Sequence, residues 1–250
     1  MPTLSARKSS TKPRRNKVHK AVLFDLDGTL LPMDQDMFIK AYFKSLAAHL
    51  APYGYDLSAL FEGIWEGTGA MIFNDGSCSN EQKFWTRFCE LCGENARNDE
   101  DKFDAYYKSE FDRTKEFCGY NHKAKEIIRK LVDKGIKTVL ATNPIFPATA
   151  TRKRMGWAGL SEDDFELVTT YENIGYCKPN LKYYQEILDR IGVAPKDAIM
   201  VGNDVSDDMV AAKLGMKVFL LTDCLINKKN EDVSTFPHGG FDELIEFLHI

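Results

Sequence analysis

Short apolar runs alternate with helical patterns along this chain, and that alternation constrains its fold more than any other feature. The apolar runs, the last of them weaker, cover residues 20–25, 136–142, 198–202, 217–221 and 166–170. Helical patterns cover residues 122–134, 148–155, 181–191, 207–214 and about 241–248. Continuous apolar runs of this length are typical of strands buried on both faces of a sheet. Strands that alternate with helices predict an α/β, Rossmann-like core: a parallel sheet with helices on both faces.

Residues 34–120 interrupt this alternation. The whole segment has a helical pattern, with an apolar stripe that starts at Phe38 and Tyr42. It holds 17 of the 29 aromatic residues, enough to build a core of its own, and 16 acidic against 9 basic side chains. The sequence therefore predicts an all-helical cap domain over 34–120, inserted into an α/β core formed by residues 20–33 and 121–250.

Charge is distributed unevenly along the chain. The net charge is −4, yet residues 1–20 carry seven basic side chains and no acidic one, so the remainder is strongly acidic. An acidic body argues against a nucleic-acid partner, because phosphate backbones attract clustered Lys and Arg. Residues 1–19 are interpreted as a disordered basic tail, with a docking arm or an organelle-targeting segment as alternatives. No apolar run approaches the ~20 residues of a membrane-spanning helix, so we expect no span.

The cysteines indicate a reducing compartment. Six cysteines are scattered over 250 residues, without the density of a disulfide framework. Cys89 and Cys92 form a CxxC, but they lie in a helical pattern and lack a second ligand pair, so we interpret them as part of a packed helix rather than a zinc or redox site. The expected location is cytoplasmic.

Polar residues gather where the predicted strands end. They are Asp25 and Asp27 after the first strand, Thr142 and Asn143 after the second, Lys178 beyond the weak third, and Asp204 and Asp208 after the fourth. The carboxyl ends of parallel strands meet at one edge of a sheet, where such folds bind their ligands. We therefore expect these side chains to converge.

Such a set of side chains suits phosphoryl transfer. Carboxylate oxygens are the ligands that Mg²⁺ prefers. Lys178 and the Thr142 hydroxyl offer positive charge and a donor for phosphoryl oxygens. An Asp beside them can attack phosphorus, and a second acid can protonate the leaving oxygen and then activate water. The two-residue spacing of Asp25 and Asp27 puts both on one side of an extended chain.

In this order the residues resemble the motifs of the haloacid-dehalogenase (HAD) superfamily. The segment DLDGT at 25–29 is similar to its first motif, Thr142 to the second, Lys178 to the third and residues 202–208 to the acidic fourth. The resemblance implies that Asp25 is the nucleophile and Asp27 the general acid/base. It also implies phosphate binding by Thr142, Asn143 and Lys178. Mg²⁺ would be held by Asp25, the main-chain carbonyl of Asp27 and an acid of the fourth motif.

The fourth motif departs from the family pattern. Asn203 stands where the family usually has Asp, and an Asp follows at 204. We interpret Asp204 as a direct metal ligand and Asp208 as its direct or indirect partner, with Asp207 and the Asn203 carbonyl as alternatives. In carrying an acid at position 27, the chain resembles the phosphomonoesterases and phosphomutases of the superfamily. An insert between the first and second motifs resembles the helical, C1-type cap class.

These observations favour an Mg²⁺-dependent phosphatase that acts on a small phosphorylated metabolite through an aspartyl-phosphate. A phosphomutase acting on a sugar phosphate is the closest alternative, and a non-catalytic binding protein on the same scaffold is another. The acidic cap makes polyphosphates and nucleic acids less suitable ligands. No pattern in the sequence indicates an oligomeric state.

Overall fold

A parallel sheet forms the centre of the core in the computed structural model, which describes residues 19–250. Its strand order is β3-β2-β1-β4-β5-β6. The strands are β1 (Ala21–Phe24), β2 (Lys137–Leu140), β3 (Leu167–Val168), β4 (Ala198–Gly202), β5 (Lys217–Leu221) and β6 (His238–Gly239). Phe24 pairs with Leu140 on one side and Val201 on the other, so β1, β2 and β4 end at the same edge. The predicted α/β class with a parallel sheet is confirmed.

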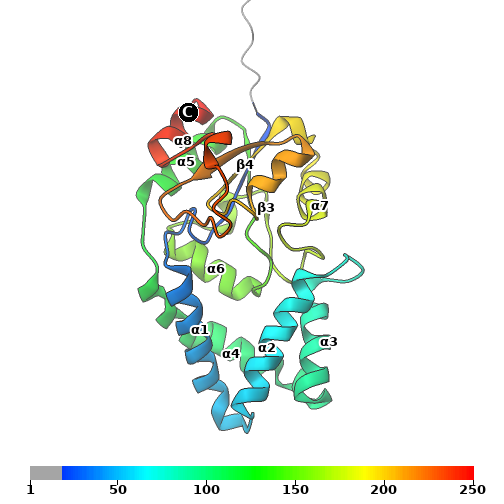
Figure 1. The fold of residues 1–250 in the computed structure, drawn as a ribbon. Helices are drawn as coiled ribbons and strands as arrows, with labels where there is room; N and C mark the ends of the chain where they lie inside the picture. The colour runs from blue at the N-terminus through cyan, green and yellow to red at the C-terminus, as the bar shows by residue number, and fades with distance from the viewer. Residues whose placement is uncertain (1–18) are drawn as a thin grey trace, which may run out of the picture.

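Helices cover both faces of this sheet (Figure 1). They are α5 (His122–Asp133), α6 (Ala148–Trp157), α7 (Leu181–Ile191) and α8 (Phe241–Leu248), with 3₁₀ turns η4 (Glu162–Asp164), η5 (Pro195–Asp197), η6 (Met209–Leu214) and η7 (Val233–Thr235). Val22 and Phe24 belong to the apolar core that includes α5, α6 and α8. Ala21 and Leu23 point to the opposite face and pack with α7 and η6. Because successive side chains of β1 enter these two apolar cores in turn, every residue of the strand is apolar.

Two elements differ from the sequence-based prediction. Strand β6 was not predicted, because two residues, His238 and Gly239, carry no periodicity to recognise. Residues 207–214 were predicted as a helix and form only the 3₁₀ turn η6. The segment is short: η6 covers Met209–Leu214 and ends at Gly215, whose φ is 87°.

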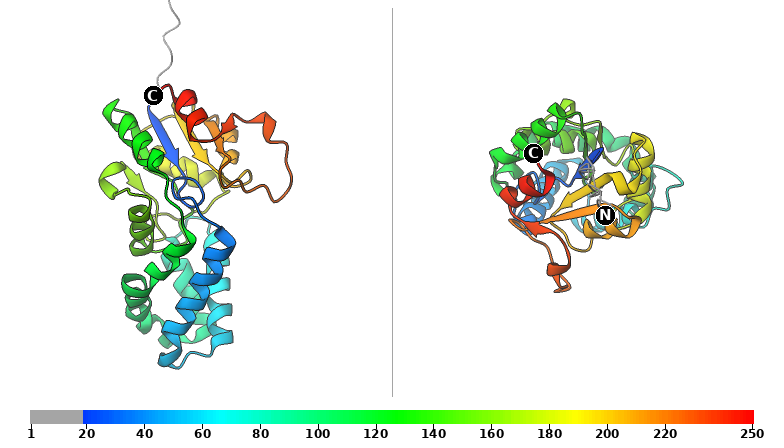
Figure 2. Two further views of the ribbon diagram at one scale, coloured as in Figure 1. Left: turned by 90° about the vertical axis from the view of Figure 1, so that its left-hand side faces the viewer. Right: turned by 90° about the horizontal axis from the view of Figure 1, so that it is seen from above.

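The cap is a separate group of helices beyond the end of the sheet (Figures 1 and 2). It consists of α1 (Gln35–Leu50), η1 (Ala51–Tyr53), α2 (Leu57–Ile72), α3 (Asn80–Cys92), η2 (Glu94–Asp99), α4 (Glu100–Ser109) and η3 (Glu110–Phe117). Asp34, Asp56 and Ser79 cap the first turns of α1, α2 and α3 through their side-chain oxygens. The predicted inserted helical cap is therefore present, while its exact limits at 34 and 120 stay a prediction.

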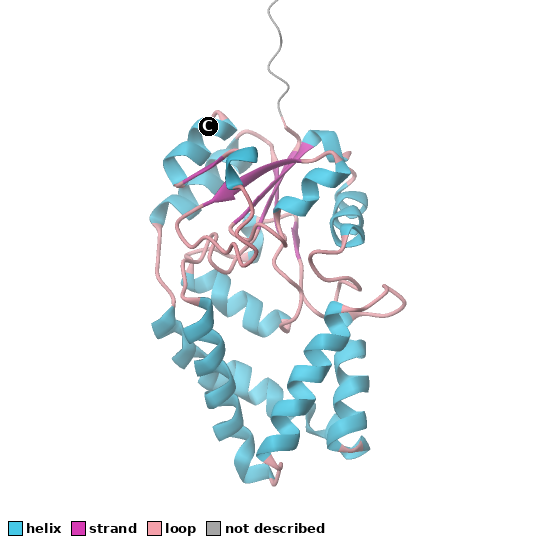
Figure 3. Cartoon of the chain, in the orientation of Figure 1, coloured by secondary structure: helices cyan, strands magenta, loops and turns pink. Residues whose placement is uncertain are grey.

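A loop at residues 73–79 breaks the predicted continuous helix between α2 and α3 (Figure 3). Gly76 takes a positive φ of 85°, and the Asp75 carboxylate accepts the Ser77 N–H at 3.1 Å. This turn chemistry sends the chain toward the core, where the Asn80 side chain donates to the Pro144 carbonyl at 3.1 Å. The loop thus joins the cap to the segment that follows β2.

The predicted basic tail, residues 1–19, lies outside the described residues except for His19. Within residues 19–250, no helix combines the length and the apolar character needed to cross a bilayer.

Candidate active site

The predicted site residues converge on one pocket of about 150 Å³ at the carboxyl edge of the sheet. Two hydrogen bonds extend the sheet beyond β1: Asp25 N–H donates to the Val201 carbonyl at 2.9 Å, and Ala141 N–H donates to the Phe24 carbonyl at 2.7 Å. They align the residues that follow each strand. All seven residues expected from the sequence line the pocket, together with others that include Asn203 and Asp207; the seven are Asp25, Asp27, Thr142, Asn143, Lys178, Asp204 and Asp208.

Lys178 lies at the centre of the pocket, only 3% exposed. Its Nζ is 2.8 Å from Asp25 Oδ1 and 2.7 Å from Asp208 Oδ1. Burial opposes the charge on Lys178, but Asp208 and Asp25 outweigh it and hold the lysine pKa well above its usual value. Asn143 positions this residue, because its Oδ1 accepts the Lys178 main-chain N–H at 3.2 Å. Lys178 is therefore a fixed cation beside the Asp25 carboxylate.

A second set of contacts fixes the other oxygen of Asp25. The Thr29 hydroxyl lies 3.2 Å from Asp25 Oδ2 and 3.0 Å from Asn203 Oδ1. Asn203 in turn donates through Nδ2 to the Cys224 carbonyl at 2.7 Å. Gly28 makes this packing possible: its φ is 83°, and a Cβ there would approach Asn203 Nδ2 to 2.3 Å. The glycine of the DLDGT segment is thus needed for both its backbone angle and its close contact.

The acidic segment after β4 is organised by hydrogen bonds. Asp208 Oδ2 accepts the Asp204 N–H at 3.0 Å, while Asp204 Oδ1 accepts the N–H groups of Ser206 and Asp207 at 2.7 and 2.9 Å. Gly202 leaves room for Asp208, since a Cβ there would lie 2.1 Å from Asp208 Oδ2. Burial raises the pKa of Asp208 and of Asp207, and Lys178 only partly offsets this.

Asp27 is paired with Arg154 of α6, a residue that the sequence analysis missed. The Arg154 Nη1 donates to Asp27 Oδ2, and the arginine side chain has no exposed surface. Its guanidinium also lies 4.4 Å from the centre of the Phe146 ring. Burial raises the pKa of Asp27, an effect that Arg154 opposes and Asp25 reinforces. Asp27 Oδ1 is buried without a hydrogen-bond partner among the described residues, which leaves it available to a ligand.

Thr142 is held through its main chain. Its carbonyl accepts the hydroxyls of Thr169 and Tyr183 at 2.7 and 2.8 Å. The threonine is 2% exposed and lines the pocket with Asn143. These contacts fix the backbone after β2, so the Thr142 side chain has a defined position at the pocket wall.

The donor chemistry of the pocket fits Mg²⁺. Five aspartates line it, and Lys178 is the one basic residue among the described lining residues, so the pocket has excess negative charge. Asp208 is engaged at both oxygens, by Lys178 and by the Asp204 N–H. Asp204 Oδ2, in contrast, takes part in none of the hydrogen bonds found within residues 19–250. No preformed cluster of three metal-binding side chains occurs in that part of the chain. The oxygen set thus suits Mg²⁺, and Asp204 offers it an oxygen without a hydrogen bond among the described residues.

Known proteins with similar sequences or folds were compared with this chain. A segment of 70 residues, 28% of the chain, is 33% identical to the glyceraldehyde 3-phosphate phosphatase of Methanothermobacter thermautotrophicus and spans 31% of that protein, less than a third of its length. An HAD phosphatase from Thermococcus onnurineus is similar in fold (TM-score 0.56, 22% identity, 92% of this chain and 97% of that one). So is the magnesium-bound HAD hydrolase YfnB of Bacillus subtilis (TM-score 0.54, 19% identity, 93% and 100%).

The family assignment rests on a longer match. The pattern of haloacid dehalogenase-like hydrolases covers residues 19–215, most of the chain, a range that includes all seven predicted site residues. The protein therefore belongs to the haloacid dehalogenase-like hydrolase family.

Proposed function

We propose that this protein is an Mg²⁺-dependent phosphatase that hydrolyses the phosphate monoester of a small metabolite through an aspartyl-phosphate on Asp25. One observation carries the proposal: the Asp25 carboxylate is fixed between Lys178 at 2.8 Å and Thr29 at 3.2 Å in a pocket that Asp27 also lines. A carboxylate held rigidly beside a buried cation is suited to attack a phosphoryl group whose charge that cation stabilises.

The first half-reaction transfers the phosphoryl group to the protein. An oxygen of Asp25 attacks phosphorus, the new P–O bond forms, and the ester P–O bond breaks. Protonated Asp27 gives its proton to the departing alkoxide, a role that fits its raised pKa. Lys178 and the Thr142 hydroxyl bind the phosphoryl oxygens, and Asn143 keeps Lys178 in place.

The second half-reaction returns the protein to its starting state. Ionised Asp27 takes a proton from a water molecule, which attacks phosphorus and displaces the Asp25 carboxylate as inorganic phosphate forms. Asp25, the main-chain carbonyl of Asp27 and Asp204 would hold Mg²⁺. When bound, the ion supplies positive charge that offsets the excess carboxylate charge and stabilises the phosphoryl oxygens.

Hydrolysis fits the site better than a phosphomutase reaction. A mutase must retain a sugar carrying two phosphates while it turns over, and the described pocket residues include one basic side chain, Lys178. A putative β-phosphoglucomutase from Thermotoga maritima shares the fold (TM-score 0.52, 20% identity, 92% of this chain and 98% of that one), so the chemistry has to be tested directly. Release of inorganic phosphate, rather than a rearranged sugar phosphate, from a hexose 1-phosphate would distinguish the two. A cytoplasmic location stays a prediction.

The Asp25→Asn substitution tests the proposal. It removes the attacking oxygen charge while keeping the shape of the side chain, so we expect Mg²⁺-dependent phosphate release to fall by on the order of 10³-fold or more. Asp223→Asn, which changes an exposed acid outside the pocket, is the matched control and should keep full activity. Circular dichroism would establish that both variants fold. Activity retained by Asp25→Asn would refute the mechanism, and no release from any ester by the wild-type protein would favour a non-catalytic binding protein.

A further inference from the structure

A second cavity of about 140 Å³ lies in the cap, next to the phosphoryl pocket. Ile39, Ile145 and Phe146 line both spaces, so the two cavities adjoin each other at these apolar side chains. Phe146 also contacts the guanidinium of Arg154, the partner of Asp27. A substrate whose leaving oxygen lies beside Asp27 would therefore extend past Phe146 into this second space.

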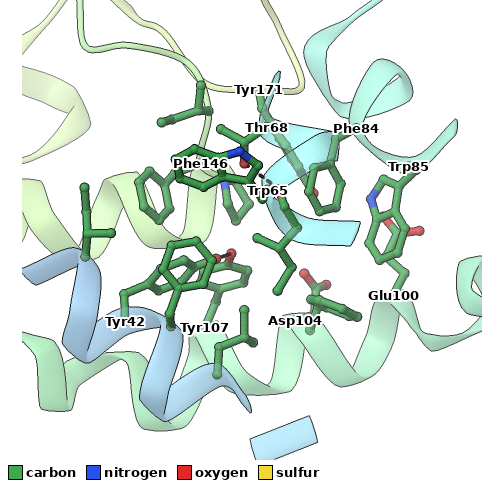
Figure 4. A pocket seen from close by; sticks show the side chains of 17 residues that line it. Tyr42, Trp65, Thr68, Phe84, Trp85, Glu100, Asp104, Tyr107, Phe146 and Tyr171 are labelled. Atoms are coloured by element: carbon green, nitrogen blue, oxygen red, sulfur yellow. Dashed lines mark hydrogen bonds between the residues drawn. The ribbon is translucent and has the colours of Figure 1, made fainter. Parts of the chain in front are cut away.

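The walls of the cavity are apolar and aromatic (Figure 4). Side chains from α1, α2, α3 and α4 meet the loop after β2 there, among them Trp65, Phe84 and Tyr107. Three of the hydroxyls in the walls have partners: Tyr42 and Tyr107 bond to each other at 2.7 Å, and Thr68 donates to the Ile64 carbonyl at 2.8 Å. Trp85 Nε1 is buried without a hydrogen-bond partner among the described residues, so a guest would meet one unpaired donor in a wall made mainly of rings and aliphatic groups.

The charged side chains that line the cavity are acidic. Among the described residues that line it, the ionisable acids are Glu100 and Asp104, and none is Lys, Arg or His. Both acids lie toward solvent, with side chains 37% and 48% exposed, and they pair with Arg97 at 3.4 Å and Lys108 at 3.8 Å, two residues outside the cavity lining. A carboxylate or second phosphate placed here would lose its hydration without meeting a cation. The cavity therefore excludes anionic leaving groups.

The volume sets the size of the guest. An apolar cavity of about 150 Å³ accommodates one benzene molecule, so the space in the cap fits roughly one six-membered ring. We propose that the cavity binds the leaving group of the substrate, and that the preferred substrates are monophosphate esters of uncharged alcohols that carry an apolar group of about that size. This inference rests on the proposed phosphatase function and adds a substrate class to it.

Esters of matched reactivity test this substrate class. Benzyl phosphate and ethyl phosphate both release a primary alcohol, but only the first fills the cavity, so its kcat/KM should be on the order of 10²-fold higher. 4-Carboxybenzyl phosphate keeps the ring and adds an anion, and its kcat/KM should be at least about 10-fold below that of benzyl phosphate. Fructose 1,6-bisphosphate and phosphoglycolate should also be poor substrates.

Two cap variants connect the preference to the cavity. Thr68→Phe fills it from α2 and should lower the ratio of kcat/KM for benzyl over ethyl phosphate about 10-fold. Phe73→Ala changes an 86% exposed aromatic residue at the end of α2, outside the cavity, and should leave the ratio unchanged. Binding of benzyl alcohol, followed by ligand-observed NMR, should weaken in Thr68→Phe, and thermal unfolding would show that this variant is folded.

The outcomes separate the two proposals. If no ester is hydrolysed, the phosphatase function fails, whereas benzyl alcohol binding that depends on Thr68 would still locate an apolar guest in the cavity. If all esters are hydrolysed but ethyl and benzyl phosphate have equal kcat/KM, or the carboxylated ester is preferred, the substrate class is wrong and the phosphatase function stands.

Discussion

Asp27, the proposed general acid/base, forms a buried ion pair with Arg154. The sequence places Asp27 two residues after Asp25, yet nothing near it in the chain predicts a partner 127 residues away on α6. Arg154 also donates to the Ala150 carbonyl at 3.4 Å and to Thr151 Oγ1 at 3.3 Å. These contacts and the Phe146 ring give the buried guanidinium a fixed position, and through it they fix Asp27.

Loss of this arginine should cost both stability and activity. Arg154→Met leaves the Asp27 carboxylate without its counter-charge, so we expect the free energy of unfolding to drop by about 3 kcal/mol and kcat to fall. Adding Asp27→Asn to Arg154→Met should recover part of the stability, because the unpaired charge is gone. Arg152→Met, on the exposed side of the same helix, is the control. Urea unfolding of the four proteins measures the effect, and equal stability of Arg154→Met and Arg152→Met would contradict it.

At the scale of elements, the start of α3 connects the cap to the core. Asn80 has no exposed surface, and its Nδ2 donates to the Pro144 carbonyl at 3.1 Å while its Oδ1 accepts from Asn74 at 2.8 Å. Its main-chain N–H donates to the Ile174 carbonyl at 3.0 Å. The carbonyl partners belong to the segments that lead to the phosphoryl pocket, after β2 and before Lys178. The position of the cap is thus coupled to the backbone of the site.

Truncating this side chain should loosen that connection. Asn80→Ala leaves the buried Pro144 carbonyl and Asn74 amide without their partner, which should lower the free energy of unfolding by about 2 kcal/mol. Asn98→Ala, which removes an exposed side chain of the same type in the cap, should change it by less than about 0.5 kcal/mol. Denaturant titration of both variants provides the comparison. A neutral Asn80→Ala would show that this side chain does not stabilise the connection between the cap and the core.

For the whole molecule, the concentration of acids at the sheet edge should make stability depend on both pH and Mg²⁺. The folded protein raises the pKa of Asp27, Asp207 and Asp208, chiefly by burial. A carboxyl with a raised pKa in the folded state stabilises at pH values below its unfolded pKa, and this stability is lost as the pH rises through the folded value. Mg²⁺ held at Asp25 and Asp204 would favour the ionised forms of these neighbouring carboxyls, so its binding competes with their protonation.

Stabilisation by Mg²⁺ should therefore increase with pH. The rise in Tm on adding Mg²⁺ to the EDTA-treated protein should be several degrees larger at about pH 8 than at about pH 5. In Asp25→Asn, which lacks one of the proposed ligands, most of this difference should disappear. Differential scanning calorimetry would measure the rise in Tm at both pH values for the wild-type protein and the variant. A rise in Tm that is independent of pH, or equal in the variant, would argue against a metal site built from these acids.

The sequence alone determined the α/β class and the edge of the sheet at which the site lies. Short apolar runs such as 198–202 are typical of strands buried on both faces of a sheet. Parallel strands bring their carboxyl ends to the same edge. Local patterns such as DLDGT at 25–29 therefore located Asp25, the end of the second strand located Thr142, and the resemblance to the family motifs pointed to Lys178.

Only the tertiary structure decided which groups face one another across that edge. Arg154 belongs to α6, and no pattern in the sequence of this helix predicts a buried cation. Its pairing with Asp27 depends on how α6 packs against the sheet. The tertiary structure also places the Lys178 Nζ between Asp25 and Asp208, the contact on which the proposal of Asp204 as a metal ligand rests. The cap cavity is likewise assembled from four helices and a core loop. These contacts join residues far apart in the chain, and periodicity and local motifs carry no information about such distances.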